Sequence, residues 1–216
     1  GKQGDTDTVK EVAGWALGMG NLLILAASSG KNLDLAMTIH ATAQSMNHEV
    51  EVIDICGLNL PLYTPDTEDE FKGLEHIETC MARILSCDGM IVCAPEYNGL
   101  IPPVLNNLVA WISVQSSNFR LMFNKRNVGL ASVSGGGGHQ AILSMRMQFS
   151  YLGSNVLGRS ITLNKNKTLN PESVTEMIKG VLRWVQFEHY EWQLQPIPFL
   201  KEDAFQSGDL LQWARS

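Results

Sequence analysis

Two uninterrupted apolar runs constrain the fold of this chain more than any other feature. Residues 21–28 read NLLILAAS, and residues 89–95 read GMIVCAP. A strand with one face in water alternates apolar and polar residues, whereas a strand buried on both faces is apolar throughout. The two runs therefore predict central strands of a parallel sheet that helices cover on both faces.

The segments around these runs alternate between strand and helix patterns. Further strands are predicted at residues 49–56, 127–134 and 155–163, the first of them at a sheet edge because its residues alternate. Helices are predicted at residues 31–47, about 66–87, from Pro103 onward, 139–152 and 171–194. The expected buried stripe of the second helix is Leu74, Ile77, Met81, Ile84 and Leu85. This order predicts an α/β fold, a three-layer sandwich around a five-stranded parallel sheet.

Both ends of the chain fall outside this alternation. Residues 1–20 are interpreted as an N-terminal extension with a short helix at Thr8–Leu17, and their acidic residues argue against a signal peptide. Residues 195–216 follow the predicted domain, residues 21–194, as a C-terminal extension. Because its apolar side chains need a surface to cover, we expect this extension to pack across a subunit interface.

Composition narrows the possible partners and the compartment. The 216 residues carry a net charge of -6 with no Lys/Arg run, so the chain has no electrostatic footprint for nucleic acid or an anionic membrane. No segment approaches the roughly 20 apolar residues of a membrane span. The four cysteines form no CxxC pair, so we expect buried free thiols and a reducing, cytoplasmic location.

Three unusual loops follow the first, third and fourth predicted strands: Ala27–Asn32, Pro95–Gly99 and Ser134–Gln140. In an open parallel sheet, ligands bind outside the carboxyl ends of the strands, where the strand order reverses. With the order 2-1-3-4-5 these three strands are neighbours, so their loops meet at one edge. Their convergence predicts a ligand site there.

The first loop, ASSGKN, has the features of a phosphate site. Ser28 and Ser29 offer hydroxyl groups, Gly30 permits a tight turn, and Lys31 adds a positive charge before a helix that includes Asn32. The N–H groups and the dipole of a helix N-terminus favour an anion. The loop matches neither the Walker pattern nor the dinucleotide-binding glycine pattern. The alternative is an ordinary helix cap made by Ser or Asn.

The second loop, PEYNG, offers groups suited to a flat heteroaromatic ligand. Its exposed backbone N–H and C=O groups and the Asn98 amide could form hydrogen bonds with such a ligand. Tyr97 offers a ring to lie beside it, and Gly99 permits close backbone approach. The alternative is a plain turn in which Glu96 is solvated and Tyr97 is packed.

The third loop, SGGGGHQ, contains four successive glycines, which are costly to order on folding. Such a run makes sense where the backbone passes close to a ligand or forms a mobile lid, and a slack loop is the alternative. His139 is expected to be an exposed polar residue and not a metal ligand, because no partner ligand is evident.

Longer blocks around these loops resemble the NADPH-dependent FMN reductase family of the flavodoxin-like superfamily, which includes quinone, azo-dye and chromate reductases. Residues 94–113, APEYNGLIPPVLNNLVAWIS, resemble the family block P-E-Y-N-x-S-[IV]-P-x-x-L-K-N-x-[IL]-D-W-[LA]-S. Residues 134–146, SGGGGHQAILSMR, resemble the block S-x-G-x-x-G-G-x-x-A-x-x-x-L-R. The similarity covers about residues 21–187.

The resemblance implies a flavodoxin-like fold, bound FMN, NADPH as the electron donor and a homodimer or homotetramer. It places the FMN phosphate at the first loop and the isoalloxazine ring between the second and third loops. The cofactor-binding residues expected from the loops and the resemblance together are Ser28, Ser29, Gly30, Lys31, Asn32, Pro95, Glu96, Tyr97, Asn98, Gly99, Ser134, Gly135 and Gly136.

The chain also departs from the family pattern. Its first loop lacks the family's Arg and resembles the T-x-T-G-x-T loop of flavodoxins. Either Lys31 replaces the missing charge or the phosphate is held less tightly. Leu100 stands where Ser or Gly is usual, and Asn106, Ala110 and His139 replace Lys, Asp and Gly. These changes bear on affinity and substrate access more than on the fold.

Three functions are consistent with these features. The first is an oxidoreductase that passes hydride from a nicotinamide donor through flavin N5 to a quinone, flavin, azo compound or metal oxyanion. No side chain is assigned as acid or base because the cofactor does the chemistry, and the Gly135–Gly137 amides are expected to stabilise the reduced flavin. The second is a flavodoxin-like electron-transfer protein without NADPH activity. The third is an interaction module that has lost flavin binding.

Overall fold

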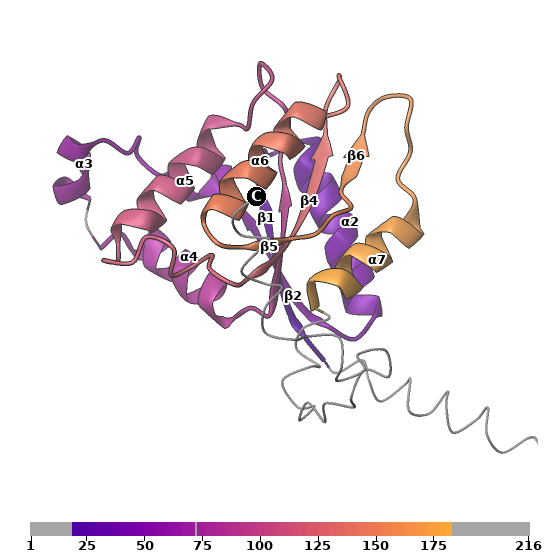
Figure 1. Ribbon diagram of the computed structural model, residues 1–216, viewed down its shortest axis with the longest axis horizontal. Coiled ribbons are helices and arrows are strands. Elements are labelled where there is room, and N and C mark those ends of the chain that lie inside the picture. The colour runs from indigo at the N-terminus through magenta and orange to yellow at the C-terminus, as the bar shows by residue number, and fades with distance from the viewer. Residues whose placement is uncertain (1–18, 72, 183–216) are drawn as a thin grey trace, which may run out of the picture. The chain divides into compact units, whose positions relative to one another are not determined.

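The computed structural model describes residues 19–71 and 73–182, in which strands and helices alternate (Figure 1). The strands are β1 (Asn21–Ala26), β2 (Glu49–Asp54), β3 (Gly89–Cys93), β4 (Asn127–Val133), β5 (Asn155–Val156) and β6 (Ile161–Leu163). The helices are α2 (Lys31–Ser45), η1 (Cys56–Leu58, a 3-10 turn), α3 (Pro65–Glu70), α4 (Glu75–Ser86), α5 (Pro103–Val114), α6 (His139–Tyr151) and α7 (Pro171–Leu182).

The strands form one parallel sheet in the order β2-β1-β3-β4-β5, and β6 also pairs with β4. The predicted order 2-1-3-4-5 is confirmed, and β2 lies at the edge as its alternating residues predicted. The register sets Leu25 of β1 opposite Ile53 of β2 and Val92 of β3. The carboxyl ends of β1, β3 and β4 therefore lie side by side.

Helices cover both faces of the sheet, which gives the predicted three layers (Figure 1). On β1, Leu23 and Leu25 pack with residues of α4, α5 and α6, whereas Leu22 and Ile24 pack with residues of α2 and α7. None of these four side chains is more than 1% exposed. Burying one such side chain contributes about 1.5–3 kcal/mol, and burial on both faces explains why residues 22–27 contain no polar position.

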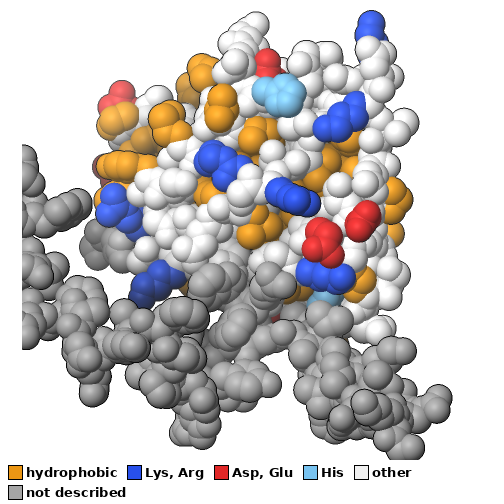
Figure 2. Space-filling view, turned by 45° about the vertical axis from the view of Figure 1, so that its right-hand side comes forward, with side chains coloured by type: hydrophobic (Ala, Val, Ile, Leu, Met, Phe, Trp, Pro, Cys, Tyr) orange, Lys and Arg blue, Asp and Glu red, His pale blue; other side chains and the backbone are white. Residues whose placement is uncertain are grey.

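The surface mixes hydrophobic and charged side chains. On the face drawn in Figure 2, Lys and Arg side chains are separated by hydrophobic and uncharged ones. Leu143, Met147 and Tyr151 of α6 are 59%, 72% and 66% exposed. They are spaced four residues apart and therefore share one side of the helix.

The second predicted helix is interrupted, so that a single helix over about residues 66–87 is wrong. The structure has α3 and α4 there, separated by Gly73, whose φ of 77° is incompatible with a right-handed helix. In α4, Ile77 and Ile84 are buried as predicted. Cys80 is also buried, whereas Leu85, predicted to face the core, is 51% exposed.

The last predicted strand, residues 155–163, is likewise broken into β5 and β6. Both pieces pair with β4, so together they occupy the fifth strand's place. The guanidinium of Arg146 on α6 donates to the carbonyl oxygens of Leu157 (2.8 Å) and Gly158 (3.2 Å). Arg146 thus satisfies backbone groups in the interruption between the two strands.

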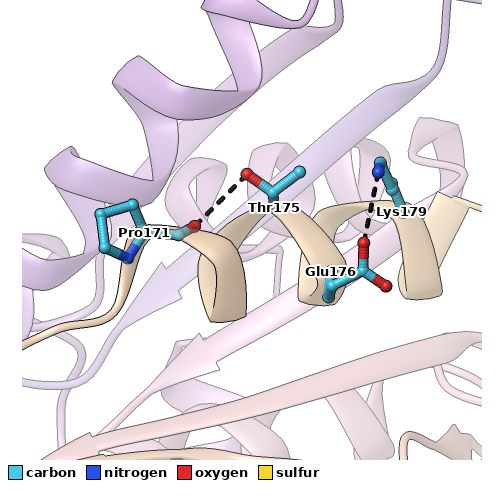
Figure 3. A network of polar contacts seen from close by, with 4 residues as sticks. All are labelled: Pro171, Thr175, Glu176 and Lys179. Atoms are coloured by element: carbon cyan, nitrogen blue, oxygen red, sulfur yellow. Dashed lines mark hydrogen bonds and ion pairs between the residues drawn. The ribbon is translucent and has the colours of Figure 1, made fainter.

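Helix α7 covers the sheet with one side only, and Figure 3 shows the polar contacts that it makes elsewhere. Its buried residues are Val174, Met177, Ile178, Val181 and Leu182. On the outer side, Thr175 Oγ1 donates to the carbonyl oxygen of Pro171 at 3.3 Å, and Lys179 Nζ lies 3.2 Å from Glu176 Oε1. Such an exposed ion pair contributes about 0.2–0.5 kcal/mol, so burial holds α7 in place.

Several predictions concern residues outside the described part of the chain. These are the helix at Thr8–Leu17 with the rest of residues 1–18, residues 183–194 of the last helix and the C-terminal extension at residues 195–216. The domain boundaries stay predictions. None of the helices described is both long and apolar enough to cross a membrane.

Candidate functional site

The loops after β1, β3 and β4 follow adjacent strands and meet at the carboxyl edge of the sheet. Two sets of hydrogen bonds join them. One runs from Asn32 to Val133, and the other from Glu96 to Ser134 and to the start of α6. The fold therefore brings the predicted site residues together, while their roles in binding stay predictions.

Asn32 joins the first loop to the end of β4. Its Nδ2 donates to the carbonyl oxygen of Val133 at 3.0 Å, and its Oδ1 accepts from the Val133 N–H at 2.9 Å. The side chain is only 2% exposed, and its partner lies 101 positions away in the sequence. Because both ends of this amide bond to protein, the backbone N–H is the group of Asn32 that is left for a ligand.

The N-terminus of α2 has no side-chain cap. Gly30 is its N-cap residue, so the alternative of an ordinary cap by Ser or Asn does not hold. Ser28 is half-buried, whereas Ser29, Gly30 and Lys31 are exposed. The first N–H groups of a helix have no partner within the helix. This arrangement suits an anion such as a phosphate.

Asn98 and Gly99 form a tight turn after β3. Their φ angles are 53° and 78°, as a type I′ turn requires, and Tyr97 and Leu100 exchange two backbone hydrogen bonds of 2.9 and 3.0 Å. The turn by itself therefore explains the Asn-Gly pair. The Tyr97 side chain is 50% exposed and is not packed as the plain-turn alternative expected.

Glu96 is bonded to the protein and is not simply solvated, in contrast to the same alternative. Its Oε2 accepts from the N–H groups of Gln140 (3.0 Å) and Ala141 (3.4 Å) at the start of α6. Its own N–H donates to Ser134 Oγ at 2.6 Å. Glu96 therefore connects the second loop to the third.

The four glycines of the third loop have different roles. Gly137 and Gly138 have φ angles of 96° and 72°, and a Cβ at Gly138 would lie 2.1 Å from Ser132 Oγ. The backbone conformation and the neighbouring side chains are therefore enough to explain the glycines at positions 137 and 138. A Cβ at Gly135 or Gly136 would meet nothing within 4 Å. The Gly137 N–H donates to the carbonyl oxygen of Ser134, so this amide is less suited to the predicted ligand contact.

The three loops together present backbone groups and open space of the kind that an FMN molecule needs. Cβ atoms at Gly30 and Gly99 would also meet nothing within 4 Å, so open space borders all three loops. Within the described residues, several loop amides donate to no protein acceptor, namely those of Ser28, Ser29, Asn98, Gly99, Gly135 and Gly136. Amides and space of this kind suit a phosphate at the first loop and a flat ring between the other two.

A fourth loop, after β6, was missed by sequence reasoning. The Ser134 N–H donates to the carbonyl oxygen of Leu163, and the Asn164 amide lies 3.8 Å from a Cβ built at Gly137. Lys167 Nζ donates to Thr162 Oγ1 at 3.2 Å. The signal that could have revealed it is the polar, basic run NKNKTLN directly after the last strand.

Three of the four thiols in the chain are buried. All four cysteines are free, and burial raises the pKa values of Cys80 and Cys93 to about 12, which keeps them protonated and unreactive. Cys56, predicted in a strand, lies half-buried in η1. His139 is exposed, and the described residues contain no cluster of metal-ligating side chains.

The model of the NADPH-dependent FMN reductase family matches residues 21–168. Over 118 residues the chain is 27% identical to an NADPH azoreductase of Bacillus sp. (strain OY1-2), covering 54% of this chain and 62% of that protein. Over 82 residues it is 34% identical to a 2-hydroxy-1,4-benzoquinone reductase of Burkholderia sp., covering 38% of this chain and 42% of that protein. The chain thus spans less than two thirds of either curated relative.

Solved structures share the predicted flavodoxin-like fold. The flavoenzyme NAD(P)H:(acceptor) oxidoreductase of Paracoccus denitrificans superposes with a TM-score of 0.61 at 16% identity, over 78% of this chain and 96% of that one. A flavodoxin from the domain Archaea superposes with a TM-score of 0.55 at 11% identity, over 78% and 99%. Similarity at this level shows the fold alone.

Proposed function

Because this chain belongs to the NADPH-dependent FMN reductase family, we propose that it is an FMN-dependent NAD(P)H oxidoreductase acting on a small acceptor. One observation carries the proposal. In the described part of the chain, amides without protein acceptors and glycines beside open space lie together on three loops at the carboxyl edge of the sheet.

The chain's own residues would bind and orient the cofactor. The hydroxyl groups of Ser28 and Ser29, the N–H groups at the start of α2 and the charge of Lys31 would hold the phosphate. Residues 95–99 and 134–136 would hold the two sides of the ring. Held in this way, FMN would supply the chemistry of two-electron transfer from a nicotinamide donor to the acceptor. The amides of Gly135 and Gly136 would stabilise negative charge on the ring.

The proposed acceptors are quinones, azo compounds, free flavin and metal oxyanions. The names of the two relatives, an azoreductase and a benzoquinone reductase, favour aromatic acceptors among these. The half-exposed ring of Tyr97 at this edge suits an aromatic ligand as well.

A second candidate is an electron carrier that holds FMN without reacting with NADPH. The similarity in fold to an archaeal flavodoxin, the short first loop and the net charge of -6 support this candidate. The family match over residues 21–168 favours the reductase.

We further propose a homodimer or homotetramer in the cytoplasm. The exposed stripe of Leu143, Met147 and Tyr151 on α6 supports association, because such a stripe gains from being covered. Four free thiols favour a reducing compartment. Light scattering during size-exclusion chromatography measures the assembly, and a monomer at micromolar concentration would contradict it.

A visible absorption spectrum tests the proposed function. FMN is added to the purified protein, and unbound flavin is then removed by desalting. We expect the bands of oxidised flavin to remain. These bands should bleach when NADPH is added anaerobically. Retained flavin that NADPH does not bleach would support the carrier. A colourless protein after desalting would overturn both candidates in favour of a module without flavin.

A further inference from the structure

Glu96 closes the N-terminus of α6 from a distant part of the chain. The N-cap residue of α6 is Gly138, which makes no side-chain cap. Glu96 Oε2 takes its place by accepting from the N–H groups of Gln140 and Ala141, 44 and 45 positions away. A carboxylate at a helix N-terminus offsets the partial positive charge of the aligned peptide dipoles.

The same residue joins the two loops that would hold the flavin ring. Its backbone N–H donates to Ser134 Oγ at 2.6 Å. The side chain is half-buried, and it forms no ion pair with a Lys, Arg or His in the parts of the chain described, residues 19–71 and 73–182. The start of α6 is therefore the main compensation for its negative charge.

We propose that Glu96 is a positioning residue that holds the reduction potential of bound FMN low. The inference rests on the proposed function, since it needs FMN between residues 95–99 and 134–136. Reduction increases the negative charge on the ring. Amides at the start of α6 would favour that charge, but Glu96 occupies two of them and adds a charge of its own. Reduction thus becomes less favourable, and the bound cofactor becomes a stronger reductant toward acceptors.

The replacement Glu96→Gln separates charge from geometry. Because Oε2 accepts both bonds to α6, a glutamine can retain them through its amide oxygen while it loses the charge. We expect the ratio of reduced to oxidised FMN at a fixed potential to rise about tenfold, which is about 30 mV for a two-electron couple. A spectroscopic titration against a reference dye measures this ratio on the purified holoprotein.

Two other replacements of Glu96 test whether the reduction potential follows the charge at this position. Glu96→Ala also lacks the charge and should raise the potential, whereas Glu96→Asp keeps the charge and should leave the potential near that of the wild type. Unlike Glu96→Gln, Glu96→Ala leaves the amides of Gln140 and Ala141 without an acceptor. It should therefore also lower the Tm of the FMN-free protein, while Glu96→Gln should leave that Tm nearly unchanged.

Glu176→Gln is the matched control. It removes one negative charge from the exposed ion pair with Lys179 on α7 (Figure 3), so it tests for an effect of net charge. We expect no change in potential. An equal rise in both glutamine variants would overturn the inference. An unchanged potential in Glu96→Gln and Glu96→Ala, with FMN retained, would also overturn it but leave the proposed function standing. Wild-type protein that retains no FMN would overturn both.

Discussion

The starts of α2 and α6 are built alike but completed differently. Each helix follows a strand in the centre of the sheet, each has a glycine at its N-cap, and neither N-cap residue supplies a side-chain bond. At α6, the carboxylate of Glu96 accepts hydrogen bonds from the N–H groups of Gln140 and Ala141. At α2, the N–H groups of Lys31 and Asn32 have no acceptor among the described residues, and the Asn32 side chain bonds to the backbone of Val133. Under the proposed function, the start of α2 would take the phosphate of FMN, whereas Glu96 neutralises the start of α6 from within the protein.

The largest effect is expected from forcing a side chain into the closed start. Gly138→Ala combines a φ of 72° with a Cβ that would lie 2.1 Å from Ser132 Oγ. We expect the free energy of unfolding to fall by about 3 kcal/mol, measured by urea denaturation of the FMN-free protein.

Gly136→Ala is the control for that prediction, because its Cβ would meet no atom within 4 Å. We expect a change in the free energy of unfolding of about 0.5 kcal/mol or less, together with weaker FMN binding. Equal destabilisation by the two replacements would show that the protein requires glycine at position 136 as strongly as at position 138.

At the start of α2, Asn32→Ala should remove the two hydrogen bonds that join the first loop to β4. The N–H and C=O groups of Val133 would lose their partners, and the free energy of unfolding should fall by about 2–3 kcal/mol. Asn166→Ala, at an exposed residue in the loop after β6, should change it by about 0.5 kcal/mol or less. An Asn32→Ala protein as stable as the control would mean that these two hydrogen bonds contribute little.

Removing the charge of Lys31 should have a smaller effect, on the affinity for FMN. We expect Lys31→Ala to weaken FMN binding about fivefold, or about 1 kcal/mol, because an exposed cation near a phosphate is screened by water. Riboflavin, which lacks the phosphate, should bind equally well to both proteins. Fluorescence titration measures both ligands, and Lys179→Ala on α7 is the control. Equal losses for FMN and riboflavin would place the phosphate elsewhere.

The smallest effect is expected at His48, away from both helix starts. Its Nδ1 accepts from the Gly20 N–H at 3.2 Å, and burial lowers the pKa of His48. Neutral His48 stabilises the folded protein, whereas the unfolded chain binds a proton at His48 more readily. The stability that His48 contributes is therefore complete above pH 6.5, the ordinary pKa of histidine. It is lost as the pH falls from 6.5 toward the lowered pKa of the folded state. We expect a loss of about 1 kcal/mol or less.

Urea denaturation between pH 7.5 and about pH 5 measures this loss for the wild type and for His48→Gln. The variant should show a shallower decline in stability, while His76→Gln, at an exposed residue of α4, should decline as the wild type does. Parallel curves for the wild type and His48→Gln would contradict the assignment.

Sequence patterns predicted the elements well where the pattern is local. The apolar runs marked β1 and β3, the alternating run marked the edge strand β2, and the predicted stripe of the second helix correctly placed Ile77 and Ile84 in the core. The errors were also local. Gly73 ends a helix that the apolar stripe seemed to continue, and residues 157–160 interrupt the last strand. In both cases the average over the segment favoured one unbroken element, although residues within it interrupt the element.

The alternation of elements, the burial of the central strands on both faces and the positions of the three unusual loops all follow from the amino-acid sequence. These properties depend on the periodicity of apolar residues along the chain, which needs no knowledge of distant partners. Tertiary structure alone decided that Asn32 bonds to Val133 and that Glu96 closes α6. A polar side chain in a loop can bond to any backbone group within reach, and the packed sheet selects which groups are within reach. The open start of α2 and the closed start of α6 therefore became distinguishable only once the loops were placed together.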